Sequence, residues 1–477
     1  MTNYLSLSLK EINKLLKDKK IKPIDLVNEA FSKIEENDLN AFITLNKEEA
    51  IKKAIELEDK EVDNLLFGIP ISIKDNIITK DLRTTCASKM LEDFIPIYDA
   101  TVIKKIKEKN MIIIGKTNMD EFAMGSTTET SYFNHAINPF DKSLVSGGSS
   151  GGSAVSVAKH HTSLSLGSDT GGSIRQPASF NGVVGMKPTY GRVSRYGLVA
   201  FSSSLDCIGP ITNNVYDNAV LLDAIAGEDL NDLTSCNKEK DFISLIGQDI
   251  KGMKIAIPNY YMSDVINNEV RNKIKEVITL LENNGAIVDY IDIKYLEYAI
   301  PLYQVIALSE VSANMARYDG IKYGYITDNY KNIDELYENT RSEGLGTEVK
   351  RRIMIGTYVL SGENADKYYY KALKVRKAMT NSFKEAFKKY DLIIGPTNTN
   401  VAYKLGENKT DALKSFYDDL LTIPVNMAGL PALSFPIGYN SDKLPIGMHI
   451  IGNYFDEKTI YKLASYLEEK LNIKGGV

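Results

Sequence analysis

The chain reads Gly147-Gly148-Ser149-Ser150-Gly151-Gly152-Ser153 and, a short distance further on, Gly167-Ser168-Asp169-Thr170-Gly171-Gly172-Ser173-Ile174-Arg175-Gln176-Pro177. Glycine lets a backbone approach a substrate closely and adopt positive φ. Successive N–H groups in such a turn can bind a developing oxyanion. A flexible Gly/Ser linker has the same composition, but both stretches lead into apolar segments, at 154–158 and 183–184. The pattern therefore favours ordered turns over a linker.

A single lysine, Lys74, ends an alternating apolar run, Ile69-Pro70-Ile71-Ser72-Ile73. A serine hydroxyl is a poor nucleophile until a base takes its proton. Histidine is the usual base, and the chain has four: His135, His160, His161 and His449. The adjacent pair lies at a predicted helix end, where a surface or capping role is the commoner one. Lysine can replace histidine if burial lowers its pKa by about 3 units, which costs roughly 4 kcal/mol. The pattern predicts a serine hydrolase with Lys74 as its base.

Composition excludes several classes of protein. The 477 residues carry 57 basic and 62 acidic side chains, a net charge of −5, so a broad basic face for nucleic acid is not expected. Three cysteines lack metal-ligand spacing, and their odd number fits a reducing cytoplasm. The N-terminus has no signal-peptide pattern, and no run of about 20 apolar residues could span a membrane. We expect a cytoplasmic protein.

Apolar runs with strand character alternate with helical patterns along the chain. The strand-like runs are 69–73, 111–114, 163–166, 253–257, 286–288, 392–394, 432–435 and 446–450. Helical spacing is seen at Leu9, Ile12, Leu15 and Leu16, and again at Leu26, Ala30, Phe31 and Ile34. Residues from about 296 to 385 read as an almost wholly helical lobe. The alternation predicts an α/β sheet with helices on both faces.

The two glycine-serine stretches, together with Lys74 in Ile73-Lys74-Asp75-Asn76, resemble the amidase signature family. The resemblance implies a Ser–Ser–Lys triad in which Ser173 is the nucleophile, Ser149 relays the proton and Lys74 is the base. It further implies that a cis peptide bond holds Ser149. The oxyanion hole implied by the family is formed by the backbone N–H groups of Thr170, Gly171, Gly172 and Ser173.

The same resemblance implies the overall architecture. The fold is expected to be a mixed β-sheet core covered by helices on both faces, with a helical lobe. We expect one amidase domain over residues 1–477, with N-terminal helices to about residue 60. The signature core then covers about 61–215, and the lobe, about 296–385, lies in the C-terminal half.

Longer blocks resemble one branch of the family, the glutamine-hydrolysing subunits of tRNA-dependent amidotransferases. These blocks are residues 119–126, 187–198, 317–321, 350–357 and 424–431. The resemblance implies that glutamine is hydrolysed to glutamate and that the ammonia passes to a partner. It also implies two partner subunits, B and C, which complete a heterotrimer. The partner is expected to bind the misacylated tRNA, Glu-tRNA(Gln) or Asp-tRNA(Asn), and to use ATP and Mg. By the same resemblance, this chain itself is expected to need no metal and no cofactor.

Three further residues are carried over as a glutamine pocket: Tyr303, Arg352 and Asp419. A free amino acid presents a carboxylate, which Arg352 can bind through two hydrogen bonds, and an ammonium, which Asp419 can pair. Arg351 is an adjacent alternative to Arg352, and Asp418 to Asp419, so the register of the pocket is open by one residue.

Rival interpretations are a nucleophile elbow, a stand-alone amidase and a scaffold without activity. Gly147–Gly151 also fits G-x-S-x-G, but that motif needs a buried strand before it, and residues 138–143 are turn-like. A stand-alone amidase for small amides would share the triad, whereas an Arg352–Asp419 pocket favours an amino acid. A scaffold would have no use for the triad. At Asn398-Thr399-Asn400 the chain departs from the proline-containing loop common in the family.

Overall fold

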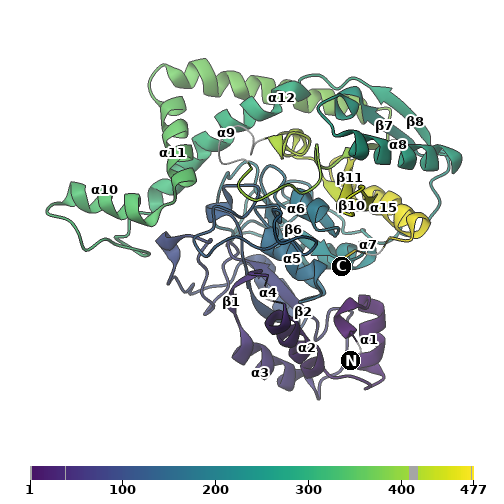
Figure 1. Cartoon of the computed structure of the whole chain (residues 1–477), viewed down its shortest axis with the longest axis horizontal. Helices are drawn as coiled ribbons and strands as arrows, with labels where there is room; N and C mark the ends of the chain where they lie inside the picture. The colour runs from purple at the N-terminus through teal and green to yellow at the C-terminus, as the bar shows by residue number, and fades with distance from the viewer. Residues whose placement is uncertain (1–2, 38, 408–416, 474, 477) are drawn as a thin grey trace.

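The computed structural model describes residues 3–37, 39–407, 417–473 and 475–476. Within them an eleven-stranded sheet runs through the centre of the molecule, in the order β1-β3-β2-β4-β6-β5-β10-β11-β9-β7-β8 (Figure 1). The strands are β1 Phe42–Leu45, β2 Pro70–Lys74, β3 Ile112–Thr117, β4 Leu164–Asp169, β5 Val184–Lys187, β6 Cys207–Thr212, β7 Lys254–Pro258, β8 Ile287–Ile291, β9 Leu392–Pro396, β10 Ala432–Tyr439 and β11 Pro445–Gly452. The sheet is mixed: β2 is parallel to β3 and β4, and β7 to β8 and β9, while the remaining pairs are antiparallel. The predicted mixed α/β fold is confirmed.

Helices surround this sheet. They are α1 Leu9–Lys17, α2 Pro23–Glu36, α3 Lys47–Leu57, α4 Thr101–Glu108, α5 Gly151–Ala158, α6 Arg175–Phe180, α7 Val215–Ile225, α8 Asn268–Asn283, α9 Ala299–Asn314, α10 Ile333–Gly344, α11 Thr347–Leu360, α12 Tyr370–Ala386, α14 Ile423–Ala428 and α15 Glu457–Leu471. Every residue of β2 is buried, which requires cover on both faces. The helix α5 covers one face, since the Ser72 hydroxyl forms a hydrogen bond with the Ser156 hydroxyl of α5 at 2.8 Å. The neighbours Ile71 and Ile73 point to the other face and join the main apolar core.

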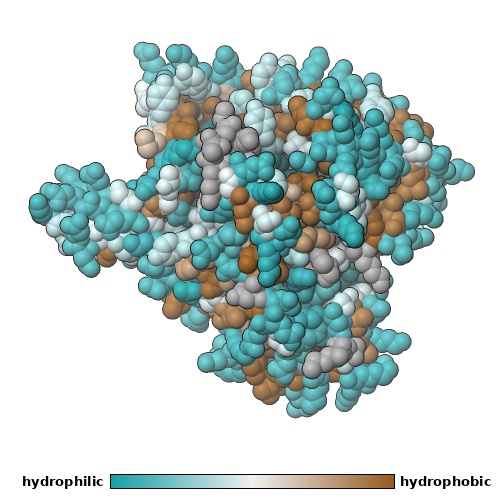
Figure 2. Space-filling model, viewed as in Figure 1, coloured by the Kyte–Doolittle hydropathy of each residue, from teal (hydrophilic) through white to brown (hydrophobic). Residues whose placement is uncertain are grey.

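The segment predicted as a helical lobe contains α9, α10, α11 and α12. These helices form an arm beside the sheet, and α10 projects furthest from the centre (Figure 1). Figure 2 shows that the projecting end of the arm is mostly hydrophilic. At its base α11 packs along α9 so closely that a Cβ on Gly356 would collide with the carbonyl of Leu308.

The N-terminal region contains α1, α2 and α3, as the sequence predicts, and also β1 at the sheet edge. A capping box begins α1: the Ser8 side chain accepts from Glu11 N–H while the Glu11 carboxylate accepts from Ser8 N–H at 2.9 Å. The carboxylate of Asp217 in α7 accepts from the N–H of Leu9 at 3.1 Å. This contact joins the first helix to the body of the fold.

All eight strand-like runs in the sequence coincide with strands of the sheet. Three strands were not predicted: β1, β5 and β6. Among the described helices, none is both long and apolar enough to cross a membrane.

Candidate active site

Lys74 ends β2 and is completely buried. Its Nζ donates to the Ser149 hydroxyl at 2.7 Å and to the Ser168 carbonyl at 3.2 Å. Burial lowers the pKa of Lys74 to about 7, against the opposing charges of Asp120, Asp169 and Asp206. A lysine side chain with this pKa is substantially deprotonated at physiological pH, and its neutral amine can take up a proton.

Ser149 lies in the turn that leads into α5, and the Gly148–Ser149 peptide bond is cis, as the family resemblance implies. A Cβ on Gly148 would collide with the carboxylate of Asp120, so this position requires glycine. The next residue connects the two serine turns: Ser150 N–H donates to the Ser173 carbonyl at 3.0 Å, and its hydroxyl donates to the Ser168 carbonyl at 3.0 Å. The geometry therefore brings Lys74, Ser149 and Ser173 into one site.

Residues 170–173 form the turn between β4 and α6, and all four are buried. Within the described part of the chain, their N–H groups donate to no protein acceptor. Buried amides are nearly always paired, so four consecutive unpaired donors form a cradle for a negatively charged atom. In the same part of the chain, no hydrogen bond joins the hydroxyls of Ser149 and Ser173.

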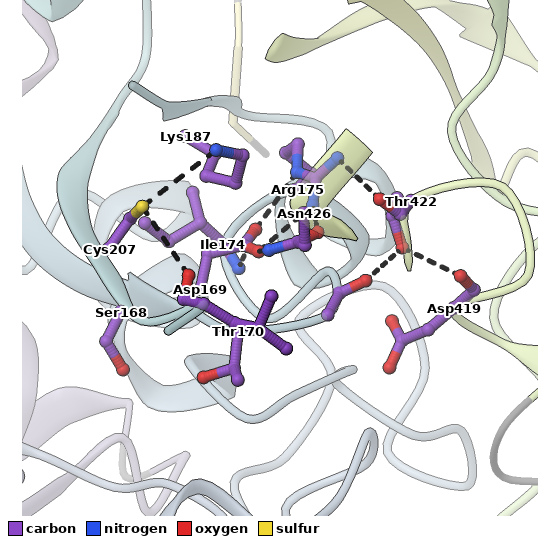
Figure 3. Close-up of polar contacts among 12 residues, drawn as sticks. Ser168, Asp169, Thr170, Ile174, Arg175, Lys187, Cys207, Asp419, Thr422 and Asn426 are labelled. Atoms are coloured by element: carbon purple, nitrogen blue, oxygen red, sulfur yellow. Dashed lines mark hydrogen bonds and ion pairs between the residues drawn. The ribbon is translucent and has the colours of Figure 1, made fainter. Parts of the chain in front are cut away.

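A buried ion pair between Asp169 and Arg175 joins the two ends of this turn. Arg175 donates from Nε and Nη2 to the two carboxylate oxygens of Asp169, at 3.0 Å each. Burial raises the pKa of Asp169, but the charge and hydrogen bonds of Arg175 outweigh it, so the net shift is downward. Two residues from the C-terminal half complete the support: Asn426 donates to Asp169 at 2.8 Å, and the Thr422 hydroxyl donates to the Gly171 carbonyl at 2.6 Å (Figure 3).

Two of the residues predicted to bind glutamine lie against the same turn. A Cβ placed on Gly171 would be 3.0 Å from the ring of Tyr303. A Cβ on Gly172 would collide with the carboxylate of Asp419, which Figure 3 shows beside Thr422. Asp419 Oδ1 is buried and has no hydrogen-bond partner among the described residues. Burial raises the pKa of Asp419 well above its ordinary value.

The third predicted residue, Arg352, projects from α11 into the interior. Its guanidinium lies 5.6 Å from the centre of the Phe201 ring, which in turn makes an edge contact with Tyr303. Its Nε donates to Glu348 at 2.6 Å. Arg352 therefore reaches the Tyr303 side of the site.

The neighbouring alternatives have different surroundings. The side chain of Arg351 is 31% exposed, against 5% for Arg352, and it forms two hydrogen bonds to Glu348. Asp418 accepts from the Ser126 hydroxyl at 2.8 Å and from Tyr403 at 2.6 Å. The carboxylate of Asp419, by contrast, abuts the turn before Ser173.

Residues 138–143 form bends and turns, and the described residues that flank them pair only through isolated bridges, such as Ile137 with Val145. The nucleophile-elbow interpretation therefore lacks its strand.

Two histidines have polar partners outside the triad. His160 lies just beyond α5 and pairs with Asn213, while His449 pairs with Arg175. Among the described residues, no group of three or more His, Cys, Asp or Glu could hold a metal ion.

Residues 25–461 match the Amidase family. The chain belongs to the amidase family. Over 473 residues it is 54% identical to the A subunit of a glutamyl-tRNA(Gln) amidotransferase from Staphylococcus epidermidis, and the match covers 98% of this chain and 97% of the relative. The crystal structure of the A subunit of the glutamyl-tRNA(Gln) amidotransferase from Thermotoga maritima is 41% identical, with a TM-score of 0.82 and coverage of 98% of this chain and 95% of that one. A peptide amidase from Stenotrophomonas maltophilia is 25% identical, with a TM-score of 0.82 and coverage of 98% and 97%.

Several residues around the site of this amidase-family chain were not singled out from the sequence. Asp206 is buried, accepts from the Thr170 hydroxyl at 2.6 Å, and has its pKa raised to about 6 by burial. Thr422 and Asn426 come from the distant C-terminal half. Asp169 and Arg175 carried a signal, since they lie inside the second glycine-serine stretch, and Asn426 lies inside the block 424–431.

Proposed function

We propose that this chain is the glutamine-hydrolysing subunit of a glutamyl-tRNA(Gln) amidotransferase. Relatives that match almost the whole chain carry the name of that enzyme. The observation that carries the proposal is the buried amine of Lys74, 2.7 Å from the Ser149 hydroxyl and beside the turn of unpaired amides that ends in Ser173. These groups supply a base, a relay, a nucleophile and an anion cradle.

In the proposed reaction, neutral Lys74 accepts a proton from Ser149, which takes the proton of Ser173. The Ser173 oxygen attacks the side-chain amide carbon of glutamine, and the N–H groups of Thr170, Gly171, Gly172 and Ser173 receive the oxyanion. The carbon–nitrogen bond then breaks, and the proton held by Lys74 returns through Ser149 to the leaving ammonia. Water releases glutamate from the glutamyl ester by the same steps.

We assign the substrate's charged groups to the predicted pocket. Arg352 binds the α-carboxylate, and Asp419 pairs with the α-ammonium while Tyr303 closes the side of the pocket. The unpartnered Oδ1 of Asp419 supports this assignment, because a buried carboxylate without a donor is costly until a cation arrives. Once glutamine is bound, the ammonium also favours the ionised form of Asp419.

We further propose that the chain works within a larger complex. The chain acts as one amidase domain in the cytoplasm and assembles with the B and C subunits. The partner binds misacylated tRNA and uses ATP and Mg to convert its glutamate, or aspartate, to the amide. No cofactor is assigned to this chain.

Trapping with an electrophilic analogue of glutamine tests the assignment of the nucleophile. We expect mass spectrometry to find the adduct on Ser173, and Ser173→Ala to abolish glutamate release while the protein keeps its melting temperature. An adduct on Ser149, Ser150 or a cysteine would contradict the triad. Preferred turnover of simple amides over glutamine would instead favour a stand-alone amidase.

A further inference from the structure

The consecutive carboxylates of Asp120 and Glu121 face two different parts of the molecule. Asp120 faces the Ser149 turn: its N–H donates to the Ser149 carbonyl at 3.4 Å, and its carboxylate occupies the space beside Gly148. Glu121 faces away from that turn, toward the start of α11. Two adjacent residues therefore connect the triad to the arm.

Glu121 is 3% exposed, and both of its carboxylate oxygens accept from the N–H of Gly346, at 3.1 and 3.0 Å. Gly346 is the N-cap of α11, where free N–H groups and the helix dipole favour a negative charge. A Cβ on Gly346 would collide with this carboxylate. The Ser88 hydroxyl donates to Glu121 and to the Gly344 carbonyl at the end of α10, which closes the contact around the α10–α11 junction.

The helix that Glu121 holds is the one that carries Arg352. Arg352 is six residues beyond Gly346, or about 9 Å along the axis at 1.5 Å per residue. Beyond it, Gly356 fixes α11 against Leu308 of α9. Arg352 thus lies between the Glu121–Gly346 contact and the Gly356–Leu308 contact. Of these two, only the Glu121–Gly346 contact connects α11 to the loop beside Ser149.

We propose that Glu121 is a positioning residue that sets the distance between Arg352 and the serine triad, and so determines the affinity for the carboxylate of the substrate. This inference rests on the proposed function, in which Arg352 binds that carboxylate. Burial raises the pKa of Glu121 to about 7, while the Ser88 and Gly346 donors favour its ionised form. The carboxylate is the form that both donors recognise.

The test is Glu121→Gln in the full chain, purified with its partner subunits. We expect KM for glutamine to rise about tenfold, as when one charge-assisted hydrogen bond is lost, with kcat reduced less than about twofold. Inactivation by an electrophilic glutamine analogue should slow by about the same factor. Inactivation by phenylmethanesulfonyl fluoride, a serine reagent without a carboxylate, should keep its wild-type rate.

Two variants control the experiment. Ser88→Ala keeps the charge of Glu121 but removes one of its hydrogen-bond donors, so KM should rise by a smaller factor. This variant tests the inference if Glu121→Gln does not fold. Glu338→Gln, at an exposed position of α10, should change nothing. An unchanged KM, a loss confined to kcat, or equal slowing of both reagents would overturn the inference. A wild-type complex without glutaminase activity would instead overturn the proposed function.

Discussion

At the scale of single residues, Lys74 holds an ammonium group in an environment that disfavours its charge. Because burial lowers the pKa to about 7, the fraction of neutral base increases as the pH rises through 7. We expect kcat/KM for glutamine to rise about tenfold per pH unit below that value and to level off above it. The pH profile of glutamate release from about pH 5.5 to about pH 9 measures this.

Replacing Lys74 by arginine distinguishes two roles for the lysine, that of a general base and that of a fixed positive charge. A guanidinium stays protonated over the whole accessible pH range, so Lys74→Arg should be nearly as inactive as Lys74→Ala. Lys371→Arg, at an exposed position of α12, is the matched control and should keep the wild-type rate. An arginine variant with a large share of wild-type activity would show that Lys74 supplies only charge.

The same buried lysine should weaken the fold. Its folded pKa of about 7 lies below the unfolded value of about 10.4, so between these values the unfolded chain binds the proton that the folded chain lacks. Stability therefore increases with pH across this window, and near pH 7 the cost is on the order of 4 kcal/mol.

Lys74→Met removes that cost and takes the Lys74 donor away from the Ser149 hydroxyl, while the Ser168 carbonyl still accepts from the Ser150 hydroxyl. We expect a net gain of about 1–3 kcal/mol at pH 7 and a smaller gain at about pH 9.5, where the wild type is no longer penalised in full. Denaturant unfolding at both pH values measures the difference. A variant less stable than wild type at pH 7 would contradict this account of Lys74.

Sequence reasoning could reach the residues of the site that lie in short motifs. Lys74, Ser149 and Ser173 stand in glycine-rich or alternating stretches, and the structure brings them together. Asp206 and Thr422 could not be reached, because neither lies in one of the two glycine-serine stretches and each meets the turn only in the folded chain. Their partners are fixed by strand order, which no local pattern encodes.

At the scale of elements, the contact between α9 and α11 depends on one glycine. A Cβ on Gly356 would collide with the Leu308 carbonyl, a backbone atom that cannot move without displacing α9. We expect Gly356→Ala to destabilise the protein by about 1–3 kcal/mol, although alanine is the better helix former. Because Tyr303 and Arg352 lie on these two helices, KM for glutamine should rise as well.

Thermal unfolding and glutamate release together measure this effect. Met354→Ala, two residues earlier on the exposed side of α11, serves as the control and should leave both quantities near wild type. A stabilised Gly356→Ala variant would show that the two helices separate more readily than their close packing implies.

The strands that sequence reasoning missed have physical features in common. The strand β6 contains Gly209 and Pro210, residues that are rare inside strands. The strand β5 also contains a glycine, Gly185, and β1 is a short strand at the edge of the sheet. The eight predicted runs contain consecutive or alternating apolar residues, which is the pattern that a buried strand requires. The order and direction of the strands did not follow from any of these patterns.

At the scale of the whole molecule, the site lies where the two halves of the chain meet. The sheet joins them directly, since Lys187 of β5 pairs with Ala432 of β10. The ion pair of Asp169 and Arg175 joins them again through Asn426. That arrangement agrees with a single domain, which stays a prediction.

The chain should function as part of a heteromeric complex. Ammonia released into water at neutral pH is mostly protonated and useless as a nucleophile, so hydrolysis is productive only where a closed route leads to the acceptor. The net charge of −5 offers no broad basic surface for tRNA. We therefore expect the isolated chain to hydrolyse glutamine slowly and to bind tRNA weakly.

Glutamate release by the purified chain, alone and with its partner subunits, measures this dependence. The partners should stimulate hydrolysis, and ATP with misacylated tRNA should stimulate it further, because an occupied acceptor site can then react with the ammonia. Filter binding at physiological salt should detect tRNA on the complex and not on the chain alone. The Ser173→Ala complex is the matched control, since it should bind tRNA as the wild type does and release no glutamate. Fast hydrolysis of assorted simple amides without partners, with glutamine not preferred, would assign the chain to the stand-alone amidases.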